Sequence, residues 1–224
     1  MRSFDYIESG KTLLTPHTTS LLAAIHEAKG RQSIQTTIRP DILGTLVAVA
    51  RIQSTDASNR IEGISTSDSR LNDLVSEKVT PRNRNEEEMA GYRDALSVIH
   101  ESHDYIPITP NVILQLHRDL FRHTPLTFAG HFKDSDNVII ERDAHGTSTV
   151  RFAPPSALVT PELIERACSA YTQAIRDGHT DPLLDIAMFI LDFTCIHPFN
   201  DGNGRMSRLL TLLMLYRNGY MVGK

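Results

Sequence analysis

The sequence predicts an all-α fold that carries a single β-hairpin, and three observations lead to this class. Helix-start signals, in which a capping residue precedes proline at the first helical position, occur four times along the chain. They are Thr15-Pro16, Thr109-Pro110, Thr160-Pro161 and Asp181-Pro182. Apolar residues recur at helical spacing in most of the segments between. Residues 137–152 differ, because two β-branched runs surround the turn-like stretch "DAHG".

The helices are expected in order from these apolar stripes. "PDILGTLVAVARI" predicts a helix with Gly44 as its weak point, and "RNEEEMAGYRDALSVIHES" predicts the next long one. The helix after Pro182 should end near Ile196, because the residue before a proline is disfavoured in the α conformation. A last helix should run from about Gly204 to Asn218. The core stripes are Met89, Tyr92, Leu96 and Ile99, then Val112, Ile113, Leu116 and Leu120, then Ile164, Ala167, Cys168, Tyr171 and Ile175.

The hairpin is expected to span Asn137 to Phe152. A two-stranded hairpin is only marginally stable alone, so it must pack on the helices or meet a partner. Ile139 and Ile140 are neighbours on one strand and therefore face opposite sides. We expect one of them to pack inward and the other to meet a target segment. A target strand that adds to the hairpin edge is the hypothesis for this surface.

Composition limits the classes of protein that fit. The chain has 224 residues, of which 40% are hydrophobic and 22% charged, which suits one compact unit. Within it we expect an N-terminal helical region at 1–80 and a core domain at 81–224. The net charge of -4 gives no basic footprint for nucleic acid. No secretory signal or membrane-spanning run is evident, so the expected location is cytoplasmic, and the oligomeric state stays open.

The stretch "HPFNDGNGRMSR", from His197 to Arg208, concentrates polar chemistry between two apolar helices. Glycines just before a helix N-terminus can turn backbone N–H groups toward an anion, and the helix dipole adds positive potential. Arg205 and Arg208 suit a polyphosphate. Asp201 could hold Mg²⁺ that bridges phosphates. His197 is a base that is neutral at pH 7.

Each of these features alone has a plain structural explanation. A glycine-rich helix start is common, a histidine after a helix is usually a cap or a core residue, and Asp201-Gly202 alone is a turn. The weight comes from the coincidence of a base, an acid, a glycine nest and two arginines within twelve residues. Buried arginines are costly without anionic partners, so Arg205 and Arg208 need such partners, from the protein or from a ligand.

The same stretch resembles the Fic-domain signature HxFx(D/E)GNGRxxR at every specified position. The resemblance implies a helical core with an active-site hairpin, the flap. It also implies transfer of AMP from ATP to a hydroxyl side chain of a target protein, which could be the chain itself, with release of pyrophosphate. Relatives of the Doc toxin type, which phosphorylate their targets, carry Lys where this sequence has Gly204, and this favours nucleotidyl transfer here.

The resemblance also implies roles for individual residues. His197 would be the general base and Asp201 the Mg²⁺ ligand. Phe199 would anchor the loop in the core. The phosphates of ATP would be held by Gly202, Asn203, Gly204, Arg205 and Arg208. "GHFK", which ends at Lys133, resembles the family's G-x-(F/Y)-R stretch near the flap with Lys in place of Arg, and it is grouped with Ile139 and Ile140 as a candidate for target docking.

A second motif lies upstream, where Ser58 to Gly63 matches the pattern (S/T)xxxE(G/N). A helix end with Gly63 at its C′ position explains the pattern equally well. Beside the Fic signature it resembles the family's inhibitory helix. Glu62 would then pair with Arg208 in place of the ATP γ-phosphate and prevent productive binding, with Ser58 as part of the motif.

Two classes of function remain at this stage. The first is an enzyme, a protein adenylyltransferase that needs ATP and Mg²⁺ and is autoinhibited through Glu62; removal of AMP by the same site is its reverse. The second is a catalytically silent nucleotide-binding module. Other features are given no chemistry: the "EEEM" stretch starts a helix, His100 and His103 are expected to be solvated, and His117 is expected to be a surface or packing residue. The ending "GYMVGK" favours a chain cut from a longer protein over a naturally short one.

Overall fold

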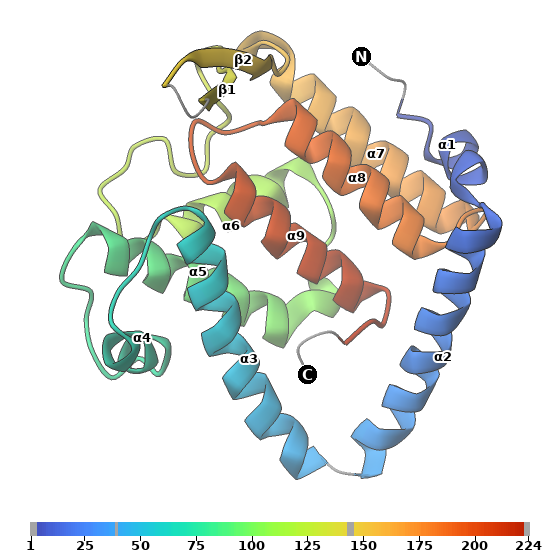
Figure 1. Ribbon diagram of the computed structural model, residues 1–224, viewed down its shortest axis with the longest axis horizontal. Helices are drawn as coiled ribbons and strands as arrows, with labels where there is room; N and C mark the ends of the chain where they lie inside the picture. The colour runs from blue at the N-terminus through green and yellow to red at the C-terminus, as the bar shows by residue number, and fades with distance from the viewer. Residues whose placement is uncertain (1–3, 39, 143–145, 222–224) are drawn as a thin grey trace.

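The protein is a helical bundle with one projecting hairpin, as the sequence predicts (Figure 1). The computed structural model describes residues 4–38, 40–142 and 146–221, and it describes no side chains at positions 33, 35–38, 40–46 and 142. The helices are α1 (Tyr6–Leu13), α2 (Pro16–Ile38), α3 (Pro40–Ile61), α4 (Asp68–Val75), α5 (Arg84–Ser102), α6 (Pro110–Leu120), α7 (Thr160–Asp177), α8 (Pro182–Ile196) and α9 (Asn203–Arg217). Short 3₁₀ turns, η1 (His103–Tyr105) and η2 (Ala157–Val159), complete the helical part.

Helix α9 lies at the centre of the bundle and contacts α3, α5, α6 and α8 (Figure 1). Its buried side chains join one continuous apolar core that includes the predicted stripes of α5, α6 and α7. Burial of this surface is the main stabilising term of a fold without disulfides. A smaller cluster links α3, α4 and α5 through Ile52, Ile64, Leu71, Val75 and Met89. The main core includes buried residues of both α8 and α9, so it fixes the two helices that flank the predicted loop.

The predicted helix starts agree with the structure at three of four places. Helices α2, α6 and α8 begin at Pro16, Pro110 and Pro182. Helix α7 instead begins at Thr160, because the η2 turn precedes it directly and the Thr160 hydroxyl donates to the Ser156 carbonyl. The prediction of Thr160 as the cap is therefore wrong by one residue.

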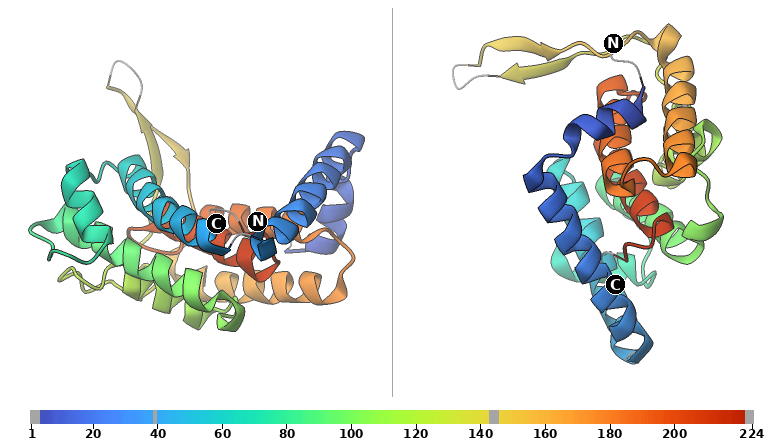
Figure 2. Two further views of the ribbon diagram at one scale, coloured as in Figure 1. Left: turned by 90° about the horizontal axis from the view of Figure 1, so that it is seen from below. Right: turned by 90° about the vertical axis from the view of Figure 1, so that its right-hand side faces the viewer.

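The hairpin consists of the antiparallel strands β1 (Ile139–Arg142) and β2 (Ser148–Phe152). It projects from the bundle, and every residue of β2 is exposed (Figure 2). Ile139 is half-buried while Ile140 is 54% exposed, so the two face opposite sides as predicted. The turn stretch "DAHG" lies largely outside the described residues. The hairpin therefore presents an apolar side chain away from the core.

Two histidines differ from the sequence-based expectation. His103 is buried rather than solvated, and His100 is half-buried. Both pack edge-on against Tyr216 of α9, and the Tyr216 hydroxyl lies 3.2 Å from Nδ1 of His100. They serve the core, because aromatic rings in this geometry attract one another. In the described part of the chain, no helix combines the length and the apolar character that a bilayer crossing requires.

Candidate functional site

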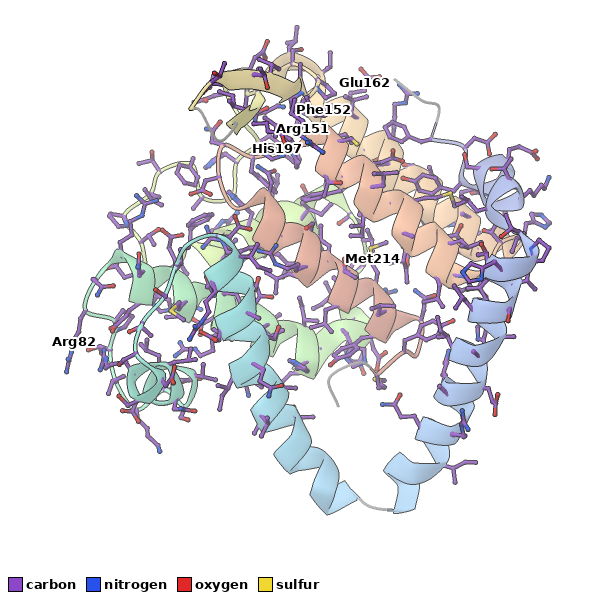
Figure 3. The ribbon with its side chains drawn as sticks, in the orientation of Figure 1. Arg82, Arg151, Phe152, Glu162, His197 and Met214 are labelled. Atoms are coloured by element: carbon purple, nitrogen blue, oxygen red, sulfur yellow. The ribbon has the colours of Figure 1, made fainter. Side chains whose placement is uncertain are left out.

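The site begins where α8 ends. His197 caps this helix with φ 50° and ψ 62°, a left-handed conformation that few residues other than glycine adopt. Its N–H donates to the Phe193 carbonyl, which closes the last turn of the helix. A strained conformation of this kind persists only where the surrounding structure enforces it, and it occurs preferentially at functional sites. In the view of Figure 3, His197 lies just below Arg151 and Phe152 of the hairpin.

The His197 ring is held in its neutral form. Burial lowers its pKa below the ordinary value, and the nearby Lys133 ammonium lowers it further. A hydrogen bond to the Thr194 backbone and the charge of Glu62 oppose these effects. A neutral imidazole can accept a proton, so this environment suits a general base.

Lys133 lies beneath the loop and not on the flap surface. Its side chain is 3% exposed, and burial lowers its pKa. Its Nζ donates to the Ile196 carbonyl at 3.2 Å and to Oδ1 of Asn137 at 2.9 Å. Its backbone N–H donates to the Pro198 carbonyl at 2.8 Å. The expectation that Lys133 contacts a docked target is therefore wrong, because the side chain is enclosed by the loop that it supports.

The middle of the loop is fastened by Asn203 and Phe199. The Asn203 side chain accepts from the Phe199 N–H at 2.9 Å and donates to the Phe199 carbonyl at 2.8 Å. The same carbonyl also accepts from Nδ2 of Asn137. Phe199 itself is fully buried and stacks on His117, with ring centroids 3.7 Å apart. The Asn203 side chain is thus occupied by the loop, which leaves only its backbone N–H for an anion.

The start of α9 offers backbone donors to a ligand. In the described part of the chain, no side chain caps this terminus. The N–H groups of Asn203, Gly204 and Arg205 lie in the first turn of α9 and have no acceptor within the helix. Gly202 precedes them with φ 83°, and a Cβ at this position would lie 2.9 Å from the Phe121 ring. Only glycine fits there. Unpaired N–H groups and the helix dipole make this terminus an anion-binding site.

Arg205 is paired with the protein. Its guanidinium is 1% exposed, and Nη1 donates to Oε2 of Glu88 at 2.7 Å. The guanidinium also stacks over Phe121 at 5.0 Å. Glu88 comes from the "EEEM" stretch, to which the sequence assigned no chemistry. Arg205 therefore holds the start of α9 against α5, and it offers a ligand its backbone N–H rather than an open guanidinium.

Arg208 points to a different partner. Its Nε donates to Oγ of Ser58 at 2.7 Å, and Nη2 donates to the Ser58 carbonyl at 3.0 Å. Nη2 also pairs with Oε1 of Glu62 at 2.7 Å. The Arg208 and Glu62 side chains are 30% and 35% exposed. The residues of the two sequence motifs, which lie about 150 positions apart, are thus in direct contact at the end of α3.

The Glu62 carboxylate also lies against the start of α9. A Cβ placed on Gly204 would fall 2.3 Å from Oε1 of Glu62, so the carboxylate uses the space that glycine leaves. Glu62 follows the last residue of α3, and Gly63 turns the chain away with φ 75°. An anionic side chain therefore occupies the region where the amides and Arg208 favour negative charge.

Asp201 is the residue best placed to hold a cation. Its side chain is 47% exposed, and Oδ1 accepts from the Gly202 N–H at 2.6 Å. Nη2 of Arg84 approaches Oδ2 at 3.9 Å. Nη2 of Arg205 also lies 3.7 Å from Oδ1. Among residues 4–38, 40–142 and 146–221 there is no group of three His, Cys, Asp or Glu side chains that could hold a metal. A single accessible carboxylate fits Mg²⁺, which usually takes one or two carboxylates together with substrate phosphates and water.

Two residues of the site, His117 and Glu88, were not predicted from the sequence. His117 lies on α6, is fully buried, and contacts the Asp201 carbonyl and the Gly130 N–H. Burial lowers its pKa to about 4. Contacts across 84 residues leave no trace in local periodicity. A buried arginine in the loop was a signal for an acidic partner such as Glu88, but it did not say which acid.

Fold and loop together define a helical bundle that places a histidine and an anion-binding helix terminus below a hairpin. Residues 107–215 match the Fic/DOC family. The chain is 37% identical over 90 residues to a Fido domain-containing protein of Dictyostelium discoideum, a match to 38% of this chain and 58% of that protein. It is 26% identical over 171 residues to the protein adenylyltransferase Fic of Nematostella vectensis, a match to 73% of this chain and 37% of the relative. The chain thus spans less than two thirds of the length of these relatives.

Solved structures agree with the fold. A Fic domain-containing signaling protein from Bacteroides thetaiotaomicron superposes with a TM-score of 0.70 at 25% identity, over 80% of this chain and 67% of that chain. A Fic family protein from Desulfovibrio desulfuricans superposes with a TM-score of 0.69 at 22% identity, over 92% and 58%. The fold class is therefore that of Fic-domain proteins, with a helical bundle and one hairpin.

Proposed function

We propose that this chain is a protein adenylyltransferase that transfers AMP from ATP to a hydroxyl group of a target protein, which could be a second copy of the chain. The observation that carries the proposal is the contiguity of a neutral histidine, an accessible aspartate and an uncapped helix terminus on one short loop. Relatives named protein adenylyltransferase support it at the level of the family.

The reaction assigns a task to each group. The N–H groups at the start of α9 and the Arg208 guanidinium would hold the phosphates of ATP. His197 would take the proton from the target hydroxyl as its oxygen attacks the α-phosphorus. A new O–P bond forms, the bond from the α-phosphorus to the bridging oxygen breaks, and pyrophosphate leaves. Mg²⁺, held by Asp201, would neutralise charge on the phosphates when bound. Transfer of this kind depends mainly on positioning and electrostatics.

Glu62 accounts for an inhibited resting state of the proposed enzyme. While it pairs with Arg208, one cationic contact for the phosphates is in use, and the carboxylate repels further negative charge at the same place. Both side chains are about one third exposed. Ion pairs that are open to solvent are weak, so a phosphate can replace the carboxylate. We propose that the end of α3 inhibits transfer in this way.

An experiment with two labels tests the reaction. The Glu62→Gly protein is incubated with Mg²⁺ and ATP labelled either on the α- or on the γ-phosphate, with Glu62→Gly/His197→Ala as its matched control. We expect the α-label on protein only when His197 is present, and the γ-label in pyrophosphate. The γ-label on protein would show phosphoryl transfer instead. Nucleotide binding without either label on protein would favour the silent binding module. Loss of label from protein that already carries AMP would favour the reverse reaction.

A further inference from the structure

His117 of α6 is held by two bonds that fix its protonation pattern. Nδ1 lies 3.0 Å from the backbone nitrogen of Gly130, which can only donate. Nε2 lies 3.0 Å from the Asp201 carbonyl oxygen, which can only accept. Nδ1 must therefore be the acceptor and Nε2 must carry the proton. The ring is neutral, and its tautomer is dictated by the backbone on both sides.

The bond to Asp201 acts on the part of the loop that carries the candidate metal ligand. The Asp201 carbonyl and the Gly202 N–H belong to one planar peptide unit and point in opposite directions. His117 holds the carbonyl end, and the Gly202 N–H donates to the Asp201 carboxylate at 2.6 Å. A rotation of this peptide would break both bonds together. The donor on His117 therefore helps to place the carboxylate on the opposite side of the peptide, where Nη2 of Arg205 also lies 3.7 Å from Oδ1.

The bond to Gly130 ties the same ring to the segment that supports the first half of the loop. Gly130 has φ 77°, and a Cβ there would lie 3.0 Å from the Arg118 side chain, so the backbone approaches α6 closely. The following residues, Lys133 and Asn137, hold the carbonyls of Ile196, Pro198 and Phe199. His117 thus contacts both supports of the loop, and its stacking on Phe199 leaves the ring no room to turn.

We infer that His117 is a positioning residue that orients the Asp201 carboxylate toward a bound metal and nucleotide through the Asp201–Gly202 peptide. The inference rests on the proposed function, in which Asp201 holds Mg²⁺. A residue that orients a metal ligand from behind typically changes metal affinity by about 10- to 100-fold when it is lost. His117 is fully buried and offers no atom to a bound substrate or metal. Its substitution should therefore change the affinity for the metal through Asp201 and leave metal-free nucleotide binding unchanged.

Three substitutions in the Glu62→Gly protein separate the contacts of His117. His117→Gln keeps a donor near the position of Nε2, His117→Asn keeps an acceptor near the position of Nδ1, and His117→Phe keeps the stacked ring alone. The readout is the Kd of ADP, measured by calorimetry in Mg²⁺ and again in EDTA. The ratio of the two values gives the contribution of the metal. Thermal unfolding of each protein verifies that it is folded.

We expect the benefit of Mg²⁺ to fall at least tenfold in His117→Asn and His117→Phe and to stay within about threefold of the parent in His117→Gln. The Kd in EDTA should be the same in all four proteins. Equal ratios in all four, or a loss in His117→Gln as large as in His117→Phe, would overturn the inference. A parent in which Mg²⁺ leaves the Kd of ADP unchanged would overturn it as well. The Glu62→Gly protein with its α-label assay tests the proposed function separately, because that assay needs no substitution at His117.

A measurement without substitution at His117 covers variants that do not fold. The ¹⁵N spectrum of the histidine side chains in the Glu62→Gly protein reports which ring nitrogen carries the proton. We expect His117 to show a protonated Nε2 and an unprotonated Nδ1. A protonated Nδ1 would contradict the donor role toward Asp201 and remove the inference.

Discussion

Arg205 and Arg208 stand three residues apart on α9, and their carboxylate partners differ in burial. Arg205 and Glu88 are 1% and 4% exposed, and they join α9 to α5 in the core. Arg208 and Glu62 are 30% and 35% exposed, and they join α9 to the end of α3. A buried pair cannot be exchanged without leaving an unpaired charge, whereas a half-exposed pair can. The same residue type thus serves as a fixed support at one position and as an exchangeable contact at the other.

The largest expected effect comes from breaking the buried pair. Glu88→Gln should lower the free energy of unfolding by about 3–5 kcal/mol, because the buried Arg205 guanidinium is then left with only the half-exposed Asp201 carboxylate, 3.7 Å away, as a counter-charge. Glu87→Gln is the matched control. Glu87 is the half-buried neighbour of Glu88 and makes no ion pair among the described residues, so its substitution should change stability by less than about 0.5 kcal/mol. Denaturant unfolding measures both. Equal small losses would show that Arg205 is not a fixed support.

Lys133 is a third cation of the site and is buried, and it acts on the candidate general base, His197. Its charge lowers the pKa of His197, so its removal should raise that pKa. When Lys133→Met is added to the Glu62→Gly protein, the rate of AMP transfer should begin to fall at a higher pH on the acid side of its pH profile. The reason is that His197, with its pKa raised, becomes protonated earlier as the pH falls. Lys133→Arg keeps the positive charge and should leave the acid limb near that of the parent. A pH–rate profile measures the shift, and a shift to lower pH would contradict the electrostatic role.

Substitution of Ser58, which contacts Arg208 beside the exchangeable Arg208–Glu62 pair, should have a smaller effect. Ser58→Ala removes the hydroxyl that accepts from Nε of Arg208 and so weakens the contact of α3 with the loop. A net hydrogen bond is worth about 0.5–1 kcal/mol, which corresponds to a two- to fivefold rise in transfer. Ser54→Ala, one turn earlier on α3, should leave the rate unchanged. A rate in Ser58→Ala equal to that in Ser54→Ala would limit the restraint to Glu62 alone.

The sequence predicted the parts of the site that lie close together in the chain. His197 to Arg208 form one contiguous stretch, and helix periodicity placed the loop between α8 and α9. The pairing of Glu62 with Arg208 was predicted through the family resemblance, not from periodicity. The hairpin was predicted because its β-branched alternation differs from the helical pattern around it.

The remaining contacts are tertiary, and local pattern does not encode them. Glu88 meets Arg205 across 117 residues, and His117 meets the loop across 84. Lys133 was grouped with the flap through the resemblance of "GHFK" to a family motif, yet burial against the Ile196 carbonyl decides its position. His103 was expected in solvent because it follows a polar helix end, yet it packs on Tyr216. In each case packing between distant elements outweighs the local signal.

The initial rate of AMP transfer in the Glu62→Gly protein, relative to the unmodified chain, tests most directly whether Arg208 exchanges Glu62 for nucleotide. We predict a rise of about tenfold or more, equivalent to about 1.4 kcal/mol of transition-state stabilisation. The free energy of unfolding should change by less than about 1 kcal/mol, because the pair is half-exposed. The rise should vanish when His197→Ala is added. A ratio of one or below, in a folded protein that still binds ATP, would contradict the account.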